Sequence, residues 1–71
     1  MNKALFRSFM TLHGDTNKSL AEFLGKSEQT VCNKINENGT EFTQGEIASI
    51  SKRYNFSADQ IKDIFFTEKV S

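Results

Sequence analysis

Two helix-start signals in the second half of the chain constrain the fold more than any other feature of the sequence. Thr43 is followed three residues later by Glu46, and Ser57 by Gln60, which is the pattern of a capping box. Apolar residues flank both boxes at the positions of a hydrophobic staple: Phe42 with Ile47, and Phe56 with Ile61. The boxes predict a fourth helix whose apolar stripe runs from Ile47 to Tyr54 and a fifth that ends at about Phe66.

Three more helices are predicted before residue 40. The first runs from about Asn2 to His13 and ends at Gly14, which suits a left-handed cap. The second is capped by Thr16 and runs to about Leu24, and the third follows the cap Ser27 and spans residues 28–36. Residues 37–40 form a loop in which the Asn-Gly pair favours positive φ. The flanks of that loop do not alternate apolar and polar residues, so strands are rejected and the fold class is all-α with five helices.

Length and composition exclude several classes of protein. Seventy-one residues suffice for one small domain, residues 1–71, with one core. A single cysteine excludes an internal disulfide, and a single histidine excludes the usual zinc-ligand spacings. No apolar run is long enough for a membrane span or a signal peptide, so we expect a cytoplasmic protein with no membrane partner.

The nine basic and nine acidic residues cancel, which speaks against a nonspecific nucleic-acid coat. The cancellation is uneven. Residues 1–36 carry five basic and three acidic residues, a balance of +2, and residues 37–71 therefore carry −2.

Residue patterns typical of catalysis are missing from the sequence. There is no Gly-x-Ser-x-Gly, no phosphate loop and no His-Glu-x-x-His. Asp59 and Asp63 stand at i, i+4 beside Lys62, which favours a solvated helix face over an acid–base pair. His13 lacks a nucleophile partner and is read as a capping or surface residue. We therefore expect no enzyme activity, no cofactor and no small-molecule ligand.

The segment from residue 16 to residue 36 carries the strongest functional signal. A helix, a glycine turn and a second short helix make a helix-turn-helix candidate. Its sequence, TNKSLAEFLGKSEQTVCNKIN, resembles the lambda-repressor-like, Cro-type helix-turn-helix family of bacterial and phage regulators. The resemblance extends over nearly the whole chain and implies a five-helix, sequence-specific binder of a double-stranded DNA operator, acting as a homodimer to repress transcription.

The same resemblance, together with the helical wheel of the third helix, gives the candidate contacts. The wheel places short polar side chains on the outer face, and amides can pair with adenine N6 and N7 in a major groove. Glu28 matches a base-contacting position of the family and could accept from cytosine N4. The residues expected to contact bases are Glu28, Gln29, Asn33 and Asn36, and those expected to contact phosphates are Asn17, Lys18, Lys26, Thr30 and Lys34.

Two lysines depart from the family pattern. Lys26 in the turn and Lys34 in the third helix stand where apolar residues are usual, and we expect their stems to pack while the ammonium groups stay in water. Cys32 on the same helix is read as a small space-filling residue.

An alternative function stays open at this stage. The net charge is zero, and the third helix carries Glu28 and no arginine, so the bidentate guanine contact is missing. The chain could therefore be an antirepressor that uses the same fold to bind a partner repressor protein. Phe65 and Phe66 become dimerisation candidates if either is exposed.

Overall fold

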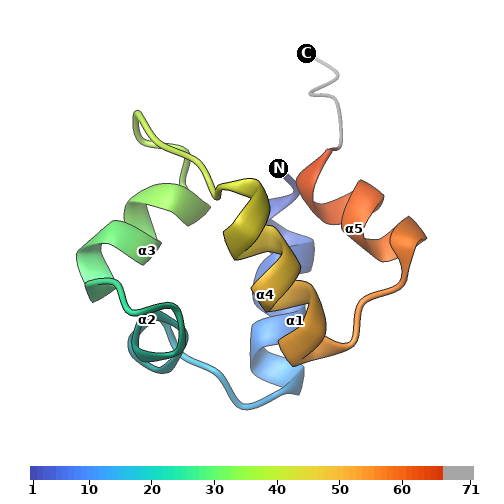
Figure 1. Cartoon of the computed structure of the whole chain (residues 1–71), viewed down its shortest axis with the longest axis horizontal. Coiled ribbons are helices and arrows are strands. Elements are labelled where there is room, and N and C mark those ends of the chain that lie inside the picture. The colour runs from blue at the N-terminus through green and yellow to red at the C-terminus, as the bar shows by residue number, and fades with distance from the viewer. Residues whose placement is uncertain (67–71) are drawn as a thin grey trace.

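The computed structural model describes residues 1–66, and in this range the chain forms five helices and no strands. They are α1 (Lys3–Leu12), α2 (Asn17–Leu24), α3 (Glu28–Ile35), α4 (Gln44–Tyr54) and α5 (Ala58–Phe65). Figure 1 shows α1 and α4 in the middle, with α2 and α3 on one side and α5 on the other. The predicted all-α fold, with α2 and α3 packed closely together, is confirmed. Within the described range, no helix is both long and apolar enough to cross a membrane.

Both predicted capping boxes form. The Thr43 hydroxyl accepts from the Glu46 amide at 3.1 Å, and the Glu46 carboxylate accepts from the Thr43 amide at 2.9 Å. Ser57 and Gln60 make the same two bonds at the start of α5. A third box begins α2, where the Ser19 hydroxyl takes the place of the usual Glu or Gln and accepts from the Thr16 amide at 2.9 Å. Reciprocal side-chain bonds therefore fix the starts of three helices.

The helix ends differ from the prediction by about one residue. Asn2 and His13 are the caps of α1 and not part of it, and Asn36 is the cap of α3. Beyond α3, positive φ falls on Glu37 and Gly39, at +55° and +75°, and not on the asparagine of the Asn-Gly pair. The reason is the helix end itself: the amide of Asn38 bonds back to the Asn33 carbonyl at 2.9 Å, and this closure needs a left-handed residue between them.

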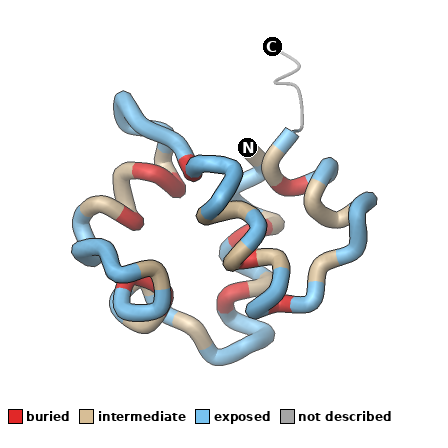
Figure 2. The backbone as a smooth tube through the Cα atoms, viewed as in Figure 1, coloured by how far each residue is buried: buried red, intermediate tan, exposed pale blue. Residues whose placement is uncertain are grey.

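The core is built around a fully buried Phe6 on α1. Its ring lies 5.7 Å from that of Phe42, 6.4 Å from Tyr54 and 5.8 Å from Phe65, so one side chain joins α1, α4, α5 and the α3–α4 connection. Figure 2 shows the buried positions on the inward sides of the helices. The other buried apolar residues are Met10, Leu20, Ala21, Val31, Ile35, Ile50 and Ile64. The backbone amide of Asn2 also donates to the Ile64 carbonyl at 2.7 Å, which ties the start of α1 to α5.

Candidate nucleic-acid interface

The α2–α3 pair turns tightly at Gly25. This residue adopts φ +67°, and the next amide, that of Lys26, donates to the Ala21 carbonyl at 2.9 Å. Ala21 and Val31 are both buried, one on each helix. A small residue on α2 and a left-handed glycine in the turn thus let the two helices pack closely.

The outward face of α3 presents amide side chains. Glu28 and Gln29 are exposed and Asn33 is half-buried. The Gln29 side-chain nitrogen donates to the Asn33 side-chain oxygen at 3.0 Å, which links the two amides into one unit. Glu28 and Gln29 also line a shallow hollow with Asn17 and Cys32. The structure therefore brings together the N-terminal ends of α2 and α3, as the helix-turn-helix prediction requires.

Two predicted contact residues are engaged in local hydrogen bonds. The Asn36 amide nitrogen donates to the Cys32 carbonyl at 3.0 Å, and its oxygen accepts from the Lys3 ammonium at 3.1 Å. The Thr30 hydroxyl lies 2.8 Å from that of Ser27. Both residues stay near the outward face, but a nucleic acid would have to compete with these partners.

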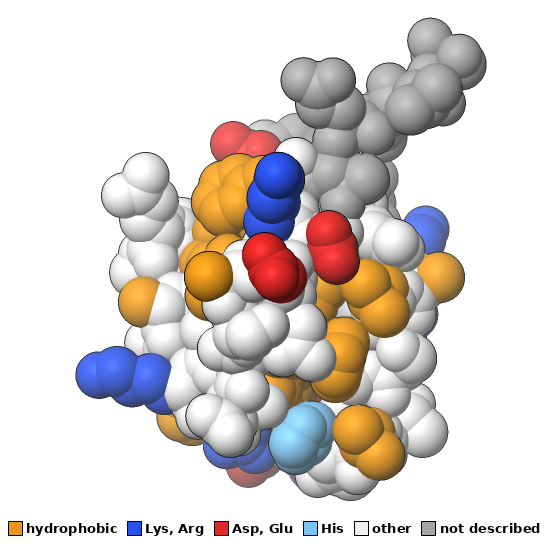
Figure 3. Space-filling model, turned by 90° about the vertical axis from the view of Figure 1, so that its right-hand side faces the viewer, with side chains coloured by type: hydrophobic (Ala, Val, Ile, Leu, Met, Phe, Trp, Pro, Cys, Tyr) orange, Lys and Arg blue, Asp and Glu red, His pale blue; other side chains and the backbone are white. Residues whose placement is uncertain are grey.

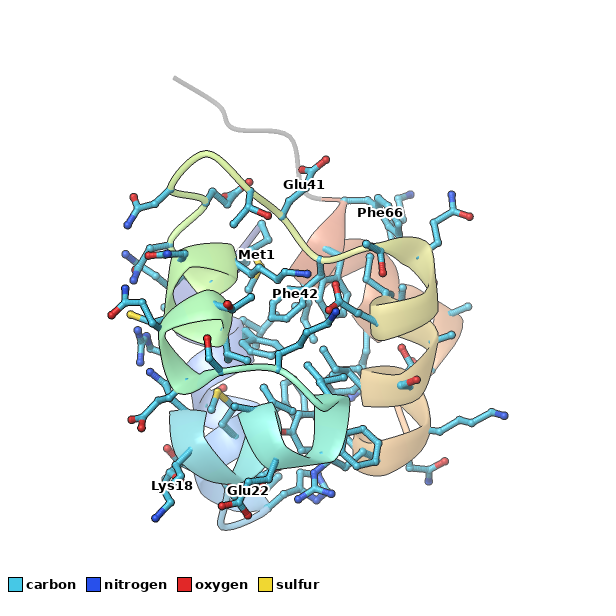
Figure 4. All side chains as sticks on the ribbon, turned by 60° about the vertical axis from the view of Figure 1, so that its left-hand side comes forward. Met1, Lys18, Glu22, Glu41, Phe42 and Phe66 are labelled. Atoms are coloured by element: carbon cyan, nitrogen blue, oxygen red, sulfur yellow. The ribbon has the colours of Figure 1, made fainter. Side chains whose placement is uncertain are left out.

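Three basic residues lie at or next to α2: Arg7 and Lys18 near its start, and Lys26 in the turn after its end. Lys18 projects from α2 at the edge of the molecule, as Figure 4 shows, and Lys26 is exposed in the turn. Arg7 of α1 lines a second hollow together with Asn17 and Glu28, and sequence reasoning missed it. The sequence places Lys3 and Arg7 one helical turn apart on α1, but nothing in the spacing says that this face adjoins α2 and α3.

The prediction for Lys34 is wrong. Its ammonium is not in water, because it donates to Glu46 at 2.5 Å and the two side chains are only 10% and 11% exposed. Burial disfavours the charged carboxylate, but hydrogen bonds from Lys34 and from Thr43 outweigh this and lower the pKa of Glu46. The physical reason is the α4 capping box, which holds a carboxylate beside this face of α3. A phosphate contact by Lys34 is therefore excluded in this arrangement, and α3 loses its only basic residue from the outward face.

A second polar network fixes the α1–α2 connection to α4. The Asp15 carboxylate accepts two hydrogen bonds from Arg53, each 2.8 Å, and one from the Tyr54 hydroxyl at 2.5 Å. Ser19 of α2 donates to the same carboxylate at 2.8 Å. The hydrogen bonds from Arg53 are the main reason why the pKa of Asp15 falls well below its usual value. This network sets the position of α2 relative to the core.

The two other residues considered from the sequence, His13 and Cys32, contact neighbouring side chains. His13 is exposed and stacks on the Tyr54 ring at 4.8 Å between centroids, in keeping with its reading as a surface residue. Cys32 is half-buried and its sulfur accepts from the Asn36 amide at 3.4 Å.

Comparison of the chain with protein-family models, with curated proteins and with solved structures gives no match. Function must therefore be inferred from the side chains that α1, α2 and α3 present.

Proposed function

We propose that the chain is a sequence-specific DNA-binding transcriptional regulator that lays α3 in the major groove, with α2 across the backbone. The observation that carries the proposal is the linked amide pair Gln29–Asn33 on the outward face of the second helix of a tightly turned pair. A short helix with polar outward side chains fits the width of a major groove. The same pattern supports a Cro-type regulator that represses by occluding its operator.

The amide pair has a defined recognition chemistry. One N–H of Gln29 is used by Asn33, so the second N–H and the carbonyl oxygen remain for a base. Adenine offers an acceptor at N7 and a donor at N6, which match those two groups. Glu28, one residue earlier, is an acceptor that suits the N4 amino group of cytosine. We infer that an A·T pair and a neighbouring C·G pair dominate each half-site.

Phosphate contacts come from the residues around the start of α2. The free backbone N–H groups of a helix N-terminus favour an anion, and Asn17 lies there. Arg7 lines a hollow with Asn17, and the exposed residues Lys18 on α2 and Lys26 in the turn after it add positive charge. Three such cations predict that binding weakens steeply with salt, since each neutralised phosphate releases a counterion.

One observation favours a second candidate function. With Lys34 bound to Glu46, the outward face of α3 carries the charge of Glu28 and no basic residue that belongs to α3 itself. An acidic, amide-rich helix also suits a protein surface, as in an antirepressor that binds a partner repressor protein.

In vitro selection from a random DNA pool tests the proposal, followed by fluorescence anisotropy from about 50 to 200 mM salt. We expect enriched sites that contain adenine, and Gln29→Ala should weaken binding to them while removing the preference at one base pair. Gln44→Ala, an exposed glutamine at the start of α4, is the matched control and should change neither. A pool that shows no enrichment, with equally weak binding to all duplexes, would refute the regulator and leave the antirepressor, for which a stoichiometric complex with a repressor is the readout.

A further inference from the structure

The Asn38–Gly39 pair lies in an exposed loop that follows α3. Figure 1 shows this loop projecting beyond the helices, and Figure 2 shows it in the colour of exposed residues. Gly39 borders a shallow hollow together with Glu37, Thr40 and Glu41. Apart from the neighbours of Gly39 in the chain, no described atom lies within 4 Å of the position that a β-carbon on Gly39 would take. Water therefore reaches this pair, and there is open space beside Gly39.

The side chain of Asn38 differs from those of most other asparagines in the chain. Among the described residues, it forms no hydrogen bond with the protein. Hydrogen bonds hold the side chains of three other asparagines: Asn2, Asn33 and Asn36. A carboxamide without such a partner can rotate between its rotamers, so its carbon is open to attack by a neighbouring nucleophile.

The residue after Asn38 sets it apart from all the others. The five other asparagines precede a lysine, a glutamate or a phenylalanine, whereas Asn38 precedes glycine. A side chain on the following residue crowds the approach of its backbone nitrogen to the carboxamide, and glycine has none. The Gly39 amide donates to the Glu37 carbonyl at 3.0 Å, and this bond spans only one residue, so it can open without unfolding a helix. Asn38 therefore combines an exposed carboxamide with the least hindered nucleophile that follows any asparagine.

We propose that Asn38 is a modification site at which the side chain deamidates without an enzyme. The Gly39 backbone nitrogen attacks Cγ of Asn38, so that a new N–C bond closes a succinimide ring. The Cγ–Nδ2 bond breaks, and its nitrogen leaves as ammonia with the proton of the Gly39 amide. Water then adds to either carbonyl carbon of the ring, which gives aspartate or isoaspartate at this position. Nothing is oxidised or reduced, and water is the only co-reactant.

The product carries a new negative charge at an unfavourable place. The loop from residue 37 to residue 41 already holds Glu37 and Glu41 and no basic side chain. In Figure 3, by contrast, acidic and basic side chains lie next to one another on the face that contains α5. The new charge also lies just beyond the end of α3, where the helix dipole disfavours an anion. The modification should therefore loosen the last turn of α3, in which the Asn36 amide donates to the Cys32 carbonyl at 3.0 Å.

Incubation of the full chain at neutral pH, in water enriched in a heavy oxygen isotope, tests the reaction. Peptide mapping by mass spectrometry should find heavy oxygen at residue 38 about tenfold sooner than at any other asparagine, in a mixture of aspartate and isoaspartate. Gly39→Ala should slow the uptake about tenfold, because its methyl group crowds the attacking nitrogen. Gly45→Ala changes a glycine that does not follow an asparagine, so it is the matched control and should leave the rate unchanged. The reaction needs only the loop and water, so it is independent of the proposed function.

Heavy oxygen that appears first at another asparagine would overturn the proposal. Uptake at residue 38 in the urea-unfolded chain, with none in the folded chain over the same period, would overturn it as well. Aspartate without isoaspartate, or a Gly39→Ala variant that reacts as fast as the wild type, would indicate direct hydrolysis and exclude the ring. Circular dichroism of both glycine variants checks that the helices remain.

Amide exchange tests the effect on α3. In Asn38→Asp, which carries the charge of the product, the Asn36 amide should exchange about two- to fivefold faster than in the wild type. Asn55→Asp places the same charge after α4 and is the matched control, because it should not change the exchange at Asn36. Equal rates in Asn38→Asp and in the wild type would refute the loosening of α3.

Discussion

Replacing Lys34 with methionine gives the sharpest test of how α3 is held against α4. The substitution keeps the length and the apolar stem of the side chain but removes the ammonium that donates to Glu46. The carboxylate then keeps its bond from the Thr43 amide, but it has lost its counter-charge in a place where the side chain is 11% exposed. Because one charge of a buried pair is left uncompensated, Lys34→Met should destabilise the fold by about 3 kcal/mol.

That loss is large for a chain of 71 residues. Stabilities of about 0.05 to 0.15 kcal/mol per residue give a total of roughly 4 to 11 kcal/mol. A loss of about 3 kcal/mol lowers the melting temperature by about 12 to 24 °C in a domain of this size. The change is therefore well outside the error of urea unfolding followed by circular dichroism.

A second substitution separates the charge from the packing. Glu46→Gln on the Lys34→Met background removes the stranded charge, and the glutamine can still accept from the Thr43 amide in the capping box. The double variant should recover most of the lost stability, since an ion pair replaced on both sides by neutral groups costs little. It should also keep its affinity for selected DNA, because Lys34 does not face the outward side of α3.

The pH dependence supplies a further check on the same variant. In Lys34→Met, burial without a counter-charge raises the folded-state pKa of Glu46 above its unfolded value. The destabilisation should therefore be full at pH 7 and should shrink as the pH falls from the raised pKa toward about 4.5. The buried-pair argument would be refuted if the free energy of unfolding of Lys34→Met lay within about 1 kcal/mol of the wild-type value and adding Glu46→Gln restored none of it.

The structure predicts the effects of substitutions at four other positions. Asp15→Asn removes the charge that binds Arg53 and should cost about 1 to 3 kcal/mol at pH 7 by urea unfolding. Because the folded state lowers the pKa of Asp15, its contribution is complete above about pH 5 and is lost progressively as the pH falls toward the lowered pKa. Acid titrations of wild type and variant should therefore converge only at the acid end of this range. Gly25→Ala places a β-carbon at φ +67° and should cost about 1 kcal/mol. Gly45→Ala lies inside α4, where the β-carbon would meet only the Thr43 hydroxyl at 4.0 Å, and should stabilise the fold by about 0.5 to 1 kcal/mol. Stabilisation by the first substitution would contradict the left-handed turn at Gly25. Lys18→Ala should weaken binding to all DNA sequences alike, and it should reduce the slope of the logarithm of the binding constant against the logarithm of salt concentration by about one. A loss of affinity for some sequences only, measured by anisotropy titration, would argue against a phosphate contact.

Local signals in the sequence predicted most of the fold. Capping boxes begin at Thr43 and Ser57, and glycines follow α1 and α2. Each of these signals involves residues only a few positions apart, so sequence spacing alone predicts where the helices start and end. Glu37 shows the limit of this approach. A left-handed residue was expected in this loop, but which residue adopts it depends on where α3 unwinds, and composition favoured the Asn-Gly pair.

The ion pairs could not be predicted from spacing. Lys34 and Glu46 lie on different helices, and Asp15 and Arg53 are 38 residues apart in the sequence. Only the packed fold brings these charges together. Arg7 was missed for the same reason. The helical wheel predicted that Gln29 faces outward. The hydrogen bond from Gln29 to Asn33 could be found only from the side-chain positions in the structure. The DNA contacts of this face stay a prediction.

The hydrogen bond between Asn2 and Ile64 makes the two ends of the described chain behave as one unit. Neither α1 nor α5 can loosen at this point without breaking it, so the Asn2 amide should exchange its hydrogen with solvent only when one of the two terminal helices opens. Amide exchange at this one position therefore reports on the integrity of the whole edge where α1 starts and α5 ends. Met1 and Phe66 both line a hollow at this edge, so an opening of either terminal helix that exposes the Asn2 amide should also change the shape of that hollow.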